Sequence, residues 1–124
     1  MILQYFQLIE NTISRFESIQ TYSLNKRVIS DFFGIISGSI TLSVGILDFL
    51  EVVKMNDDGN PVKKKFKYHF RGTDNELIFR YDNVPHYPDI DTFPNHKHIG
   101  NSVEASHEPD LYFVLMEINH EFLK

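Results

Sequence analysis

The stretch Lys63–Tyr81, KKKFKYHFRGTDNELIFRY, has the clearest strand pattern of the chain. Basic and apolar residues alternate in its first half, which predicts a β-strand with one polar and one apolar face. The polar face is expected to carry Lys63, Lys65, Lys67, His69 and Arg71, and the apolar face Lys64, Phe66, Tyr68 and Phe70. Turn residues at 72–75 lead into a second strand over 76–81, so the stretch predicts an antiparallel hairpin.

The short turn determines which side chains of the two strands share a face of the hairpin. A loop of two residues and a loop of four residues give the same assignment. One face is expected to join Phe66, Tyr68 and Phe70 with Leu77, Phe79 and Tyr81. The other face is expected to join Lys67, His69 and Arg71 with Ile78, Arg80 and Asp82. We expect helices to cover the aromatic face and to leave the cationic face open.

The segments before the hairpin predict a helix and two more strands. Residues 2–19 carry apolar side chains at three- and four-residue steps, as in a helix that faces a core. These side chains belong to Ile2, Tyr5, Phe6, Ile9, Ile13 and Phe16. Phe32–Gly45 and Ile46–Met55 are rich in β-branched and aromatic residues and predict strands, followed by a turn at Asn56–Pro61.

The segment after the hairpin predicts a long loop and a second helix. Asn83–His107 is expected to be a loop, and Pro109 suits the first turn of a helix ending near Lys124. The apolar stripe of that helix consists of Leu111, Val114, Leu115, Ile118 and Phe122. The predicted fold class is therefore α+β: an N-terminal helix, a four-stranded antiparallel meander, a histidine/proline-rich loop and a C-terminal helix.

Length and composition predict one domain over residues 1–124, with 42% hydrophobic residues to form its core. The absence of cysteine excludes disulfides, thiolate catalysis and cysteine-ligated zinc. No apolar run approaches the roughly 20 residues of a membrane-spanning helix, so no membrane association is expected. The N-terminus lacks the pattern of an export signal, which makes a cytoplasmic location the expectation.

The candidate functional region is Arg80–His98, RYDNVPHYPDIDTFPNHKH, which holds half of the six histidines. Pro85, Pro88 and Pro94 stiffen it, because proline fixes φ and restricts the residue before it. A long loop that is dense in ionisable side chains is typical of a functional site.

Three kinds of chemistry fit the histidines. His86, His96 and His98 could transfer protons, with Lys97 or Arg80 stabilising charge on a phosphate, and this needs no metal or other cofactor. The same histidines could instead bind a metal together with Asp82 or Asp91, although their spacing matches no standard finger pattern. A structural role is the third reading.

The predicted cationic face supplies the candidate substrate-binding residues: Lys67, His69, Arg71, Arg80 and Asp82. Basic stripes of this kind bind phosphate backbones. The alternative is an exposed strand that lysines keep soluble. Glu51 lies between apolar neighbours of a predicted strand, so if it faces the core it needs a partner, such as a cationic residue of the next strand.

The segments RYDNVPHYP (80–88) and TFPNHKH (92–98) resemble the signature of the TumE family, and the similarity extends over nearly the whole chain. The residues that carry it are Arg80, Tyr81, Asp82, Asn83, Pro85, His86, Pro94, His96, Lys97 and His98. The resemblance implies the toxin of a type II toxin–antitoxin system. It also implies a cognate antitoxin protein, which would cover the basic face or the loop.

The resemblance does not define a biochemical activity. By analogy with other small toxins, we expect a metal-independent ribonuclease in which His86, His96, His98 and Lys97 are catalytic. One alternative is a non-catalytic binding module that docks nucleic acid or a partner protein. Another is a metal-dependent phosphodiesterase. RNA is thus the expected substrate. The sequence leaves open whether the protein forms a homo-oligomer.

Overall fold

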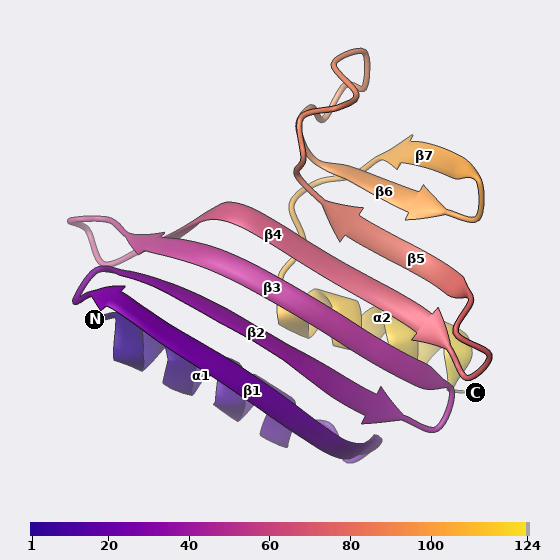
Figure 1. The fold of residues 1–124 in the computed structure, drawn as a ribbon, viewed down its shortest axis with the longest axis horizontal. Coiled ribbons are helices and arrows are strands. Elements are labelled where there is room, and N and C mark those ends of the chain that lie inside the picture. The colour runs from indigo at the N-terminus through magenta and orange to yellow at the C-terminus, as the bar shows by residue number, and fades with distance from the viewer. Residues whose placement is uncertain (124) are drawn as a thin grey trace.

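The computed structural model describes residues 1–123, which form two α-helices and seven β-strands (Figure 1). In chain order these are α1 (Ile2–Ser14), β1 (Ile19–Ser30), β2 (Phe33–Leu42), β3 (Gly45–Met55), β4 (Pro61–Gly72), β5 (Leu77–Asp82), β6 (His96–Ile99), β7 (Ser102–Ala105) and α2 (Leu111–Phe122). The strands form one antiparallel sheet in which each strand pairs with its neighbour in sequence. The predicted α+β class is confirmed.

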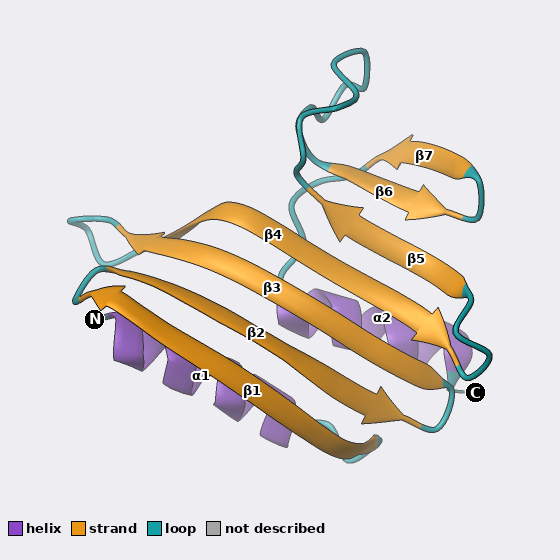
Figure 2. Ribbon diagram, viewed as in Figure 1, coloured by secondary structure: helices purple, strands orange, loops and turns teal. Residues whose placement is uncertain are grey.

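The sheet has three more strands than the four that the sequence pattern predicts. β1 is exposed along most of its length, so it lacks the alternation that marks a half-buried strand. β6 and β7 are four residues each and lie inside the predicted loop 83–107. A turn at Gly100, which has a φ of 57°, joins them. The remaining loop between β5 and β6 projects from the sheet (Figure 2).

Both helices pack against the same face of the sheet (Figure 1). The N-terminal helix ends at Ser14, earlier than predicted, and α2 ends at Phe122. The predicted end near Lys124 lies outside the described residues. Asp110 caps α2, because its side chain accepts a hydrogen bond from the backbone N–H of Phe113 at 2.7 Å. Among residues 1–123, neither helix has the length and apolar run needed to cross a membrane.

The aromatic face of the predicted hairpin forms the centre of the core. Phe66, Tyr68 and Phe70 of β4 are fully buried, and Phe79 and Tyr81 of β5 are nearly so. Apolar residues of α1 and α2 cover them: Ile2, Phe6, Ile9, Ile13, Leu111, Val114, Leu115 and Ile118. The predicted coverage of this face by helices is therefore confirmed.

Two register shifts change the predicted facing at the ends of the hairpin. Between β3 and β4, Lys63 and Lys65 pair with consecutive residues of β3, so Lys64 is an extra residue in a β-bulge. Lys63 therefore points into the covered side, where its side chain is only 7% exposed, and its predicted place on the cationic face is wrong. At the other end, a second shift puts Leu77 opposite Arg71.

The second shift also corrects the placement of Ile78. This residue was expected on the cationic face, but it packs against the hydrophobic core instead. The alternation of the sequence is thus reliable in the middle of β4 and β5 and fails where bulges insert one residue.

Candidate active site on the open face of the sheet

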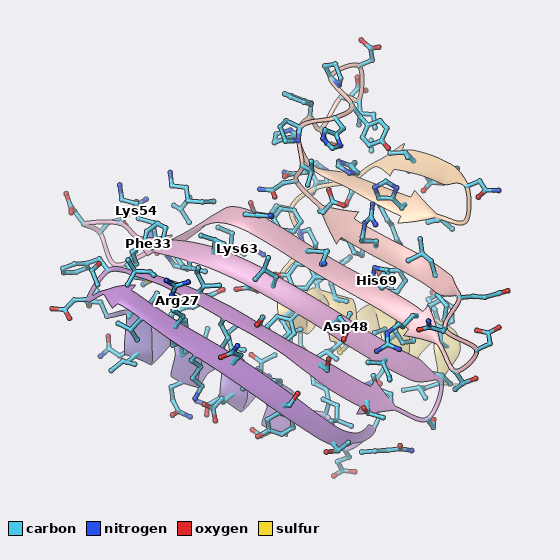
Figure 3. All side chains as sticks on the ribbon, viewed as in Figure 1. Arg27, Phe33, Asp48, Lys54, Lys63 and His69 are labelled. Carbon is cyan, nitrogen blue, oxygen red and sulfur yellow. The ribbon has the colours of Figure 1, made fainter. Side chains whose placement is uncertain are left out.

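The face of the sheet that points away from α1 and α2, here called the open face, collects most of the predicted site residues. Two rows of side chains cross three strands of this face. Lys67, Asp82 and His96 form one row, and His69, Arg80 and His98 form the next. Figure 3 shows His69 and Asp48 among the side chains of this face, with Arg27 and Lys54 farther along it.

Asp82 is the centre of this group and is almost completely buried. Its Oδ1 accepts a hydrogen bond from the backbone N–H of Val84 at 3.0 Å, and its Oδ2 accepts one from Nε of Arg80 at 2.9 Å. Nε2 of His96 lies 2.8 Å from Oδ1, and Nε2 of His98 lies 3.6 Å from Oδ2. A buried carboxylate requires hydrogen-bond partners, which Val84, Arg80 and His96 supply, and Arg80 adds a positive charge.

His96 is held at both nitrogens of its ring. Nδ1 lies 2.9 Å from the carbonyl oxygen of Pro94, while Nε2 faces Asp82. Both partners carry hydrogen-bond acceptor oxygens, so both ring nitrogens face acceptors and the orientation of the ring is fixed. With a side chain only 2% exposed, His96 is suited to orient its neighbours.

His98 is held differently. Its Nε2 lies 3.1 Å from Nη2 of Arg80. A guanidinium group can only donate, so Nε2 of His98 is the acceptor and carries no proton. Burial and then the charge of Arg80 lower the pKa of His98, against the opposing effect of Asp82. His98 is therefore a neutral imidazole near neutral pH.

These groups open into a pocket with a volume of about 320 Å³. Lys65, Lys67 and Arg80 contribute positive charge to its lining. The loop after β5 contributes Val84, His86 and Tyr87. The structure thus brings the three predicted histidines His86, His96 and His98 together with Lys67, Arg80 and Asp82 in one pocket.

Tyr87 is a pocket residue that the sequence reasoning did not assign to the site. Its ring centroid lies 4.9 Å from that of His96, 5.8 Å from that of His98 and 6.5 Å from that of His86. The available signal was an aromatic residue in a proline-bounded segment, between Pro85 and Pro88.

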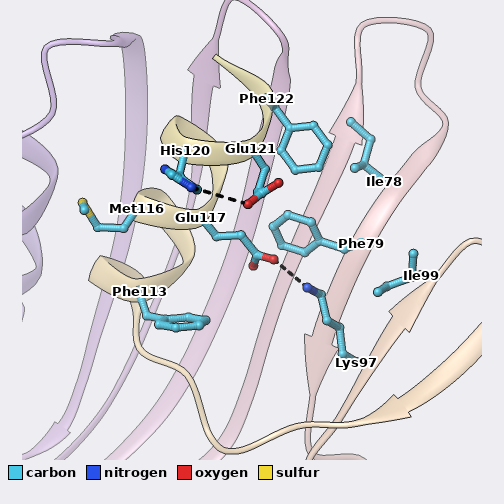
Figure 4. A pocket seen from close by; sticks show the side chains of 10 residues that line it. All are labelled: Ile78, Phe79, Lys97, Ile99, Phe113, Met116, Glu117, His120, Glu121 and Phe122. Atoms are coloured by element: carbon cyan, nitrogen blue, oxygen red, sulfur yellow. Dashed lines mark hydrogen bonds and ion pairs between the residues drawn. The ribbon is translucent and has the colours of Figure 1, made fainter. Parts of the chain in front are cut away.

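Lys97 is separated from the histidines, and its predicted place in this centre is wrong. Neighbouring residues of a strand point to opposite faces, so Lys97 points to the helix side while His96 and His98 point to the open face. Its Nζ lies 2.6 Å from Oε2 of Glu117 on α2 (Figure 4). The groove there is larger, about 640 Å³, and its lining includes Phe79, Phe113 and Met116 but none of the pocket histidines.

Two candidate substrate-binding residues lie outside the pocket. Arg71 forms an ion pair with Asp48 at 2.9 Å and donates to Oδ1 of Asn75 at 2.9 Å, so its charge is largely matched. His69 lies in the row of Arg80, and burial together with the charge of Arg80 lowers its pKa. Both belong to the open face but not to the centre.

A metal ion has one candidate set of ligands among the described residues: Asp82, His96 and His98. One ligand atom from each lies within 4.8 Å of the others. Two imidazoles and a carboxylate suit zinc, manganese or iron. Arg80 already contacts Oδ2 of Asp82 and Nε2 of His98, so a metal would have to displace its guanidinium. Asp91, the alternative carboxylate, is exposed on the loop.

The pocket residues Arg80, Asp82, His86, His96 and His98 all belong to the motif that suggested a family. The family model described as Toxin TumE matches residues 6–123 of the chain. The chain belongs to the TumE toxin family. No curated protein and no solved structure gave a significant match. The TumE motif thus coincides with the buried centre and its pocket, whereas Lys97, also in the motif, supports the packing of α2.

Proposed function

We propose that this TumE toxin cleaves single RNA chains as a metal-independent ribonuclease in which His98 accepts a proton and His86 donates one. In such a reaction, the base takes the proton of a ribose 2′-hydroxyl, whose oxygen attacks the adjacent phosphorus. The bond from phosphorus to the 5′-oxygen breaks, and the acid protonates that oxygen. The products are a 2′,3′-cyclic phosphate and a 5′-hydroxyl end.

The observation that carries this proposal is the state of His98. His98 is a neutral imidazole in a cationic pocket. It acts as a general base once a bound phosphate draws Arg80 away from Nε2, which that guanidinium contacts at 3.1 Å. His98 is also partly accessible, since 13% of its side chain is exposed. A base near neutral pH with a cation beside it is the minimum that transfer of this proton requires.

The other pocket residues have supporting roles in the proposal. Lys65, Lys67 and Arg80 bind the phosphate and stabilise its developing charge. Asp82 holds Arg80 in place through the contact at 2.9 Å. His96, with both ring nitrogens engaged, is a positioning residue. His86 is exposed at the pocket, so solvent reaches its ring.

A second candidate function is a metal-dependent phosphodiesterase, which the cluster of Asp82, His96 and His98 favours. In either case the cognate antitoxin, which the toxin family implies, would silence the enzyme by covering this pocket.

The test uses purified protein and a defined RNA in excess chelator. We expect cleavage by the unaltered protein and a loss of about 100-fold to 10,000-fold in rate for His98→Ala and for His86→Ala. Lys97→Met is the matched control, because Lys97 neighbours His98 in the strand but points to the helix side. It should cleave at close to the unaltered rate. The same two histidine variants should no longer arrest growth when expressed without antitoxin.

Three outcomes would contradict the proposal. Cleavage by His98→Ala at the unaltered rate would show that His98 is not the general base. Cleavage that stops in chelator and returns with manganese or zinc favours the metal-dependent candidate. Tight RNA binding without cleavage, unchanged in the histidine variants, favours a binding module. Thermal unfolding of each variant must accompany these assays, so that loss of fold is not read as loss of chemistry.

A further inference from the structure

We infer that Tyr87 forms a nucleobase subsite, so that the pocket takes single-stranded RNA with one base turned out of its stack. This inference rests on the proposed action on RNA and adds the substrate class and a binding residue to it. The chemical class of the ligand at the subsite is a purine or pyrimidine base attached to an RNA backbone.

The pocket has the mixed chemistry that a nucleotide requires. The strands β4 and β5 supply the cations Lys65, Lys67 and Arg80, which suit a phosphate. The loop after β5 supplies Val84 and Tyr87, which suit a flat apolar ring. The volume of about 320 Å³ is at the lower end of the range for ligand pockets, so it suits one nucleotide and not a longer segment.

Tyr87 is placed to receive a base beside the reacting groups. Its ring stands edge to face against His96 and His98, with interplanar angles of 66° and 72°. The residue nevertheless remains 37% exposed, so part of its ring is available to a ligand. Pro85 and Pro88 restrict the backbone on both sides, which lowers the entropy lost when a ligand binds.

A double helix cannot use this subsite. In duplex RNA the faces of each base are covered by its neighbours and its edges are paired, so no base can lie against Tyr87. Single-stranded RNA has unstacked bases that proteins bind on aromatic side chains, with little dependence on sequence. The inference therefore predicts a preference for single strands over duplexes of the same sequence.

The test measures binding without cleavage, by fluorescence anisotropy of a labelled RNA strand that carries 2′-O-methyl groups. We expect Tyr87→Ala and Tyr87→Leu to bind this strand roughly 10-fold to 100-fold more weakly than the unaltered protein. Tyr87→Phe, which keeps the ring, should bind within about twofold, because stacking needs only the ring. Tyr22→Ala is the control, since Tyr22 is 45% exposed on β1, away from the pocket.

Two further ligands separate base from backbone binding. The matching duplex should bind at least about 10-fold more weakly than the single strand. A strand of abasic residues should bind equally well to the unaltered protein and to Tyr87→Ala. The Leu variant covers the case in which Ala loosens the packing against His96 and His98.

The inference is overturned if Tyr87→Ala and Tyr87→Leu bind like the unaltered protein, if the duplex binds as well as the single strand, or if no RNA binds. The ribonuclease proposal is judged separately on unmodified RNA. If the protein cleaves RNA and neither cleavage nor binding depends on Tyr87, the ribonuclease proposal is supported and the subsite is contradicted. If RNA binding depends on Tyr87 but no cleavage occurs, the subsite is supported and the ribonuclease proposal is contradicted.

Discussion

At the scale of single residues, Glu51 of β3 shows how the core accommodates a buried charge. The residue is completely buried and accepts hydrogen bonds from the hydroxyls of Tyr5 and Tyr68, the latter at 2.5 Å. Lys63 reaches the same hydroxyl of Tyr68 at 2.8 Å and also donates to the carbonyl oxygen of Pro109. The expected cationic partner from the next strand is therefore present, but it acts through a tyrosine.

This geometry predicts that Tyr68→Phe lowers the free energy of unfolding by about 1–3 kcal/mol, because Glu51 loses a donor inside the core. Tyr22→Phe removes an exposed hydroxyl and should change it by less than about 0.5 kcal/mol. Urea denaturation at pH 8 measures both. Equal stabilities of the two variants would mean that the hydroxyl of Tyr68 contributes nothing.

The same two variants should differ in their response to alkaline pH. Burial and the charge of Glu51 raise the pKa of Tyr5 and of Tyr68, whereas tyrosines of the unfolded chain ionise near about 10. Above that pH the unfolded chain holds fewer protons than the folded one, so stability falls as pH rises. Burial lowers the pKa of Lys63, which opposes part of this fall. The fall should be smaller in Tyr68→Phe than in Tyr22→Phe.

At the scale of secondary-structure elements, the bulge of β4 is joined to the end of β5 by Asn83. Its Oδ1 accepts from the backbone N–H of Phe66 at 3.0 Å, and its Nδ2 donates to the carbonyl oxygen of Lys64 at 3.2 Å. The bulge lets Lys63 face the core while Lys65 faces the pocket. Asn83 follows directly after Asp82, so the same contact joins the bulge to the candidate active site.

We predict that Asn83→Ala lowers the free energy of unfolding by about 1–3 kcal/mol, since the buried N–H of Phe66 loses its acceptor. Asn83→Asp keeps an acceptor oxygen for Phe66 and should lose less. Chemical denaturation of both variants, with binding of 2′-O-methyl RNA as a second readout, measures this. If Ala is as stable as Asn at this position, the contact does not hold the bulge.

At the scale of the whole molecule, one continuous core joins both helices to the four central strands of the sheet. Residues of α1, of β2 through β5 and of α2 belong to the same buried cluster. In residues 1–123, the buried stripes of both helices belong to this cluster, so neither helix should remain folded when the sheet opens. The prediction of a single domain has the same physical basis.

Calorimetry should therefore record one unfolding transition, with the calorimetric and van't Hoff enthalpies equal. For a chain of 124 residues the enthalpy should be roughly 70–100 kcal/mol near 60 °C. Metal-free protein in chelator should give the same transition if no metal is needed for the fold. Two separate transitions would contradict the single core.

The sequence by itself predicted the features that depend on local pattern. Alternation in Phe66–Phe70 fixes which side chains face the helices, and the three- and four-residue steps of the helices fix their buried stripes. The motif in Arg80–His98 predicted the toxin family and contains the pocket histidines. Each of these rests on residues that are close together in the chain, so their spacing carries the information.

Only the tertiary structure decided which residues of that motif meet. β6 is short and polar, and it becomes a strand because β5 and β7 supply hydrogen-bond partners on both sides. Its pairing places His96 beside Asp82 and sends Lys97 to α2. The bulge at Lys64 likewise depends on contacts with β3 and with Asn83. Such contacts join residues distant in the chain, and their free energy is set by partners that no local pattern encodes.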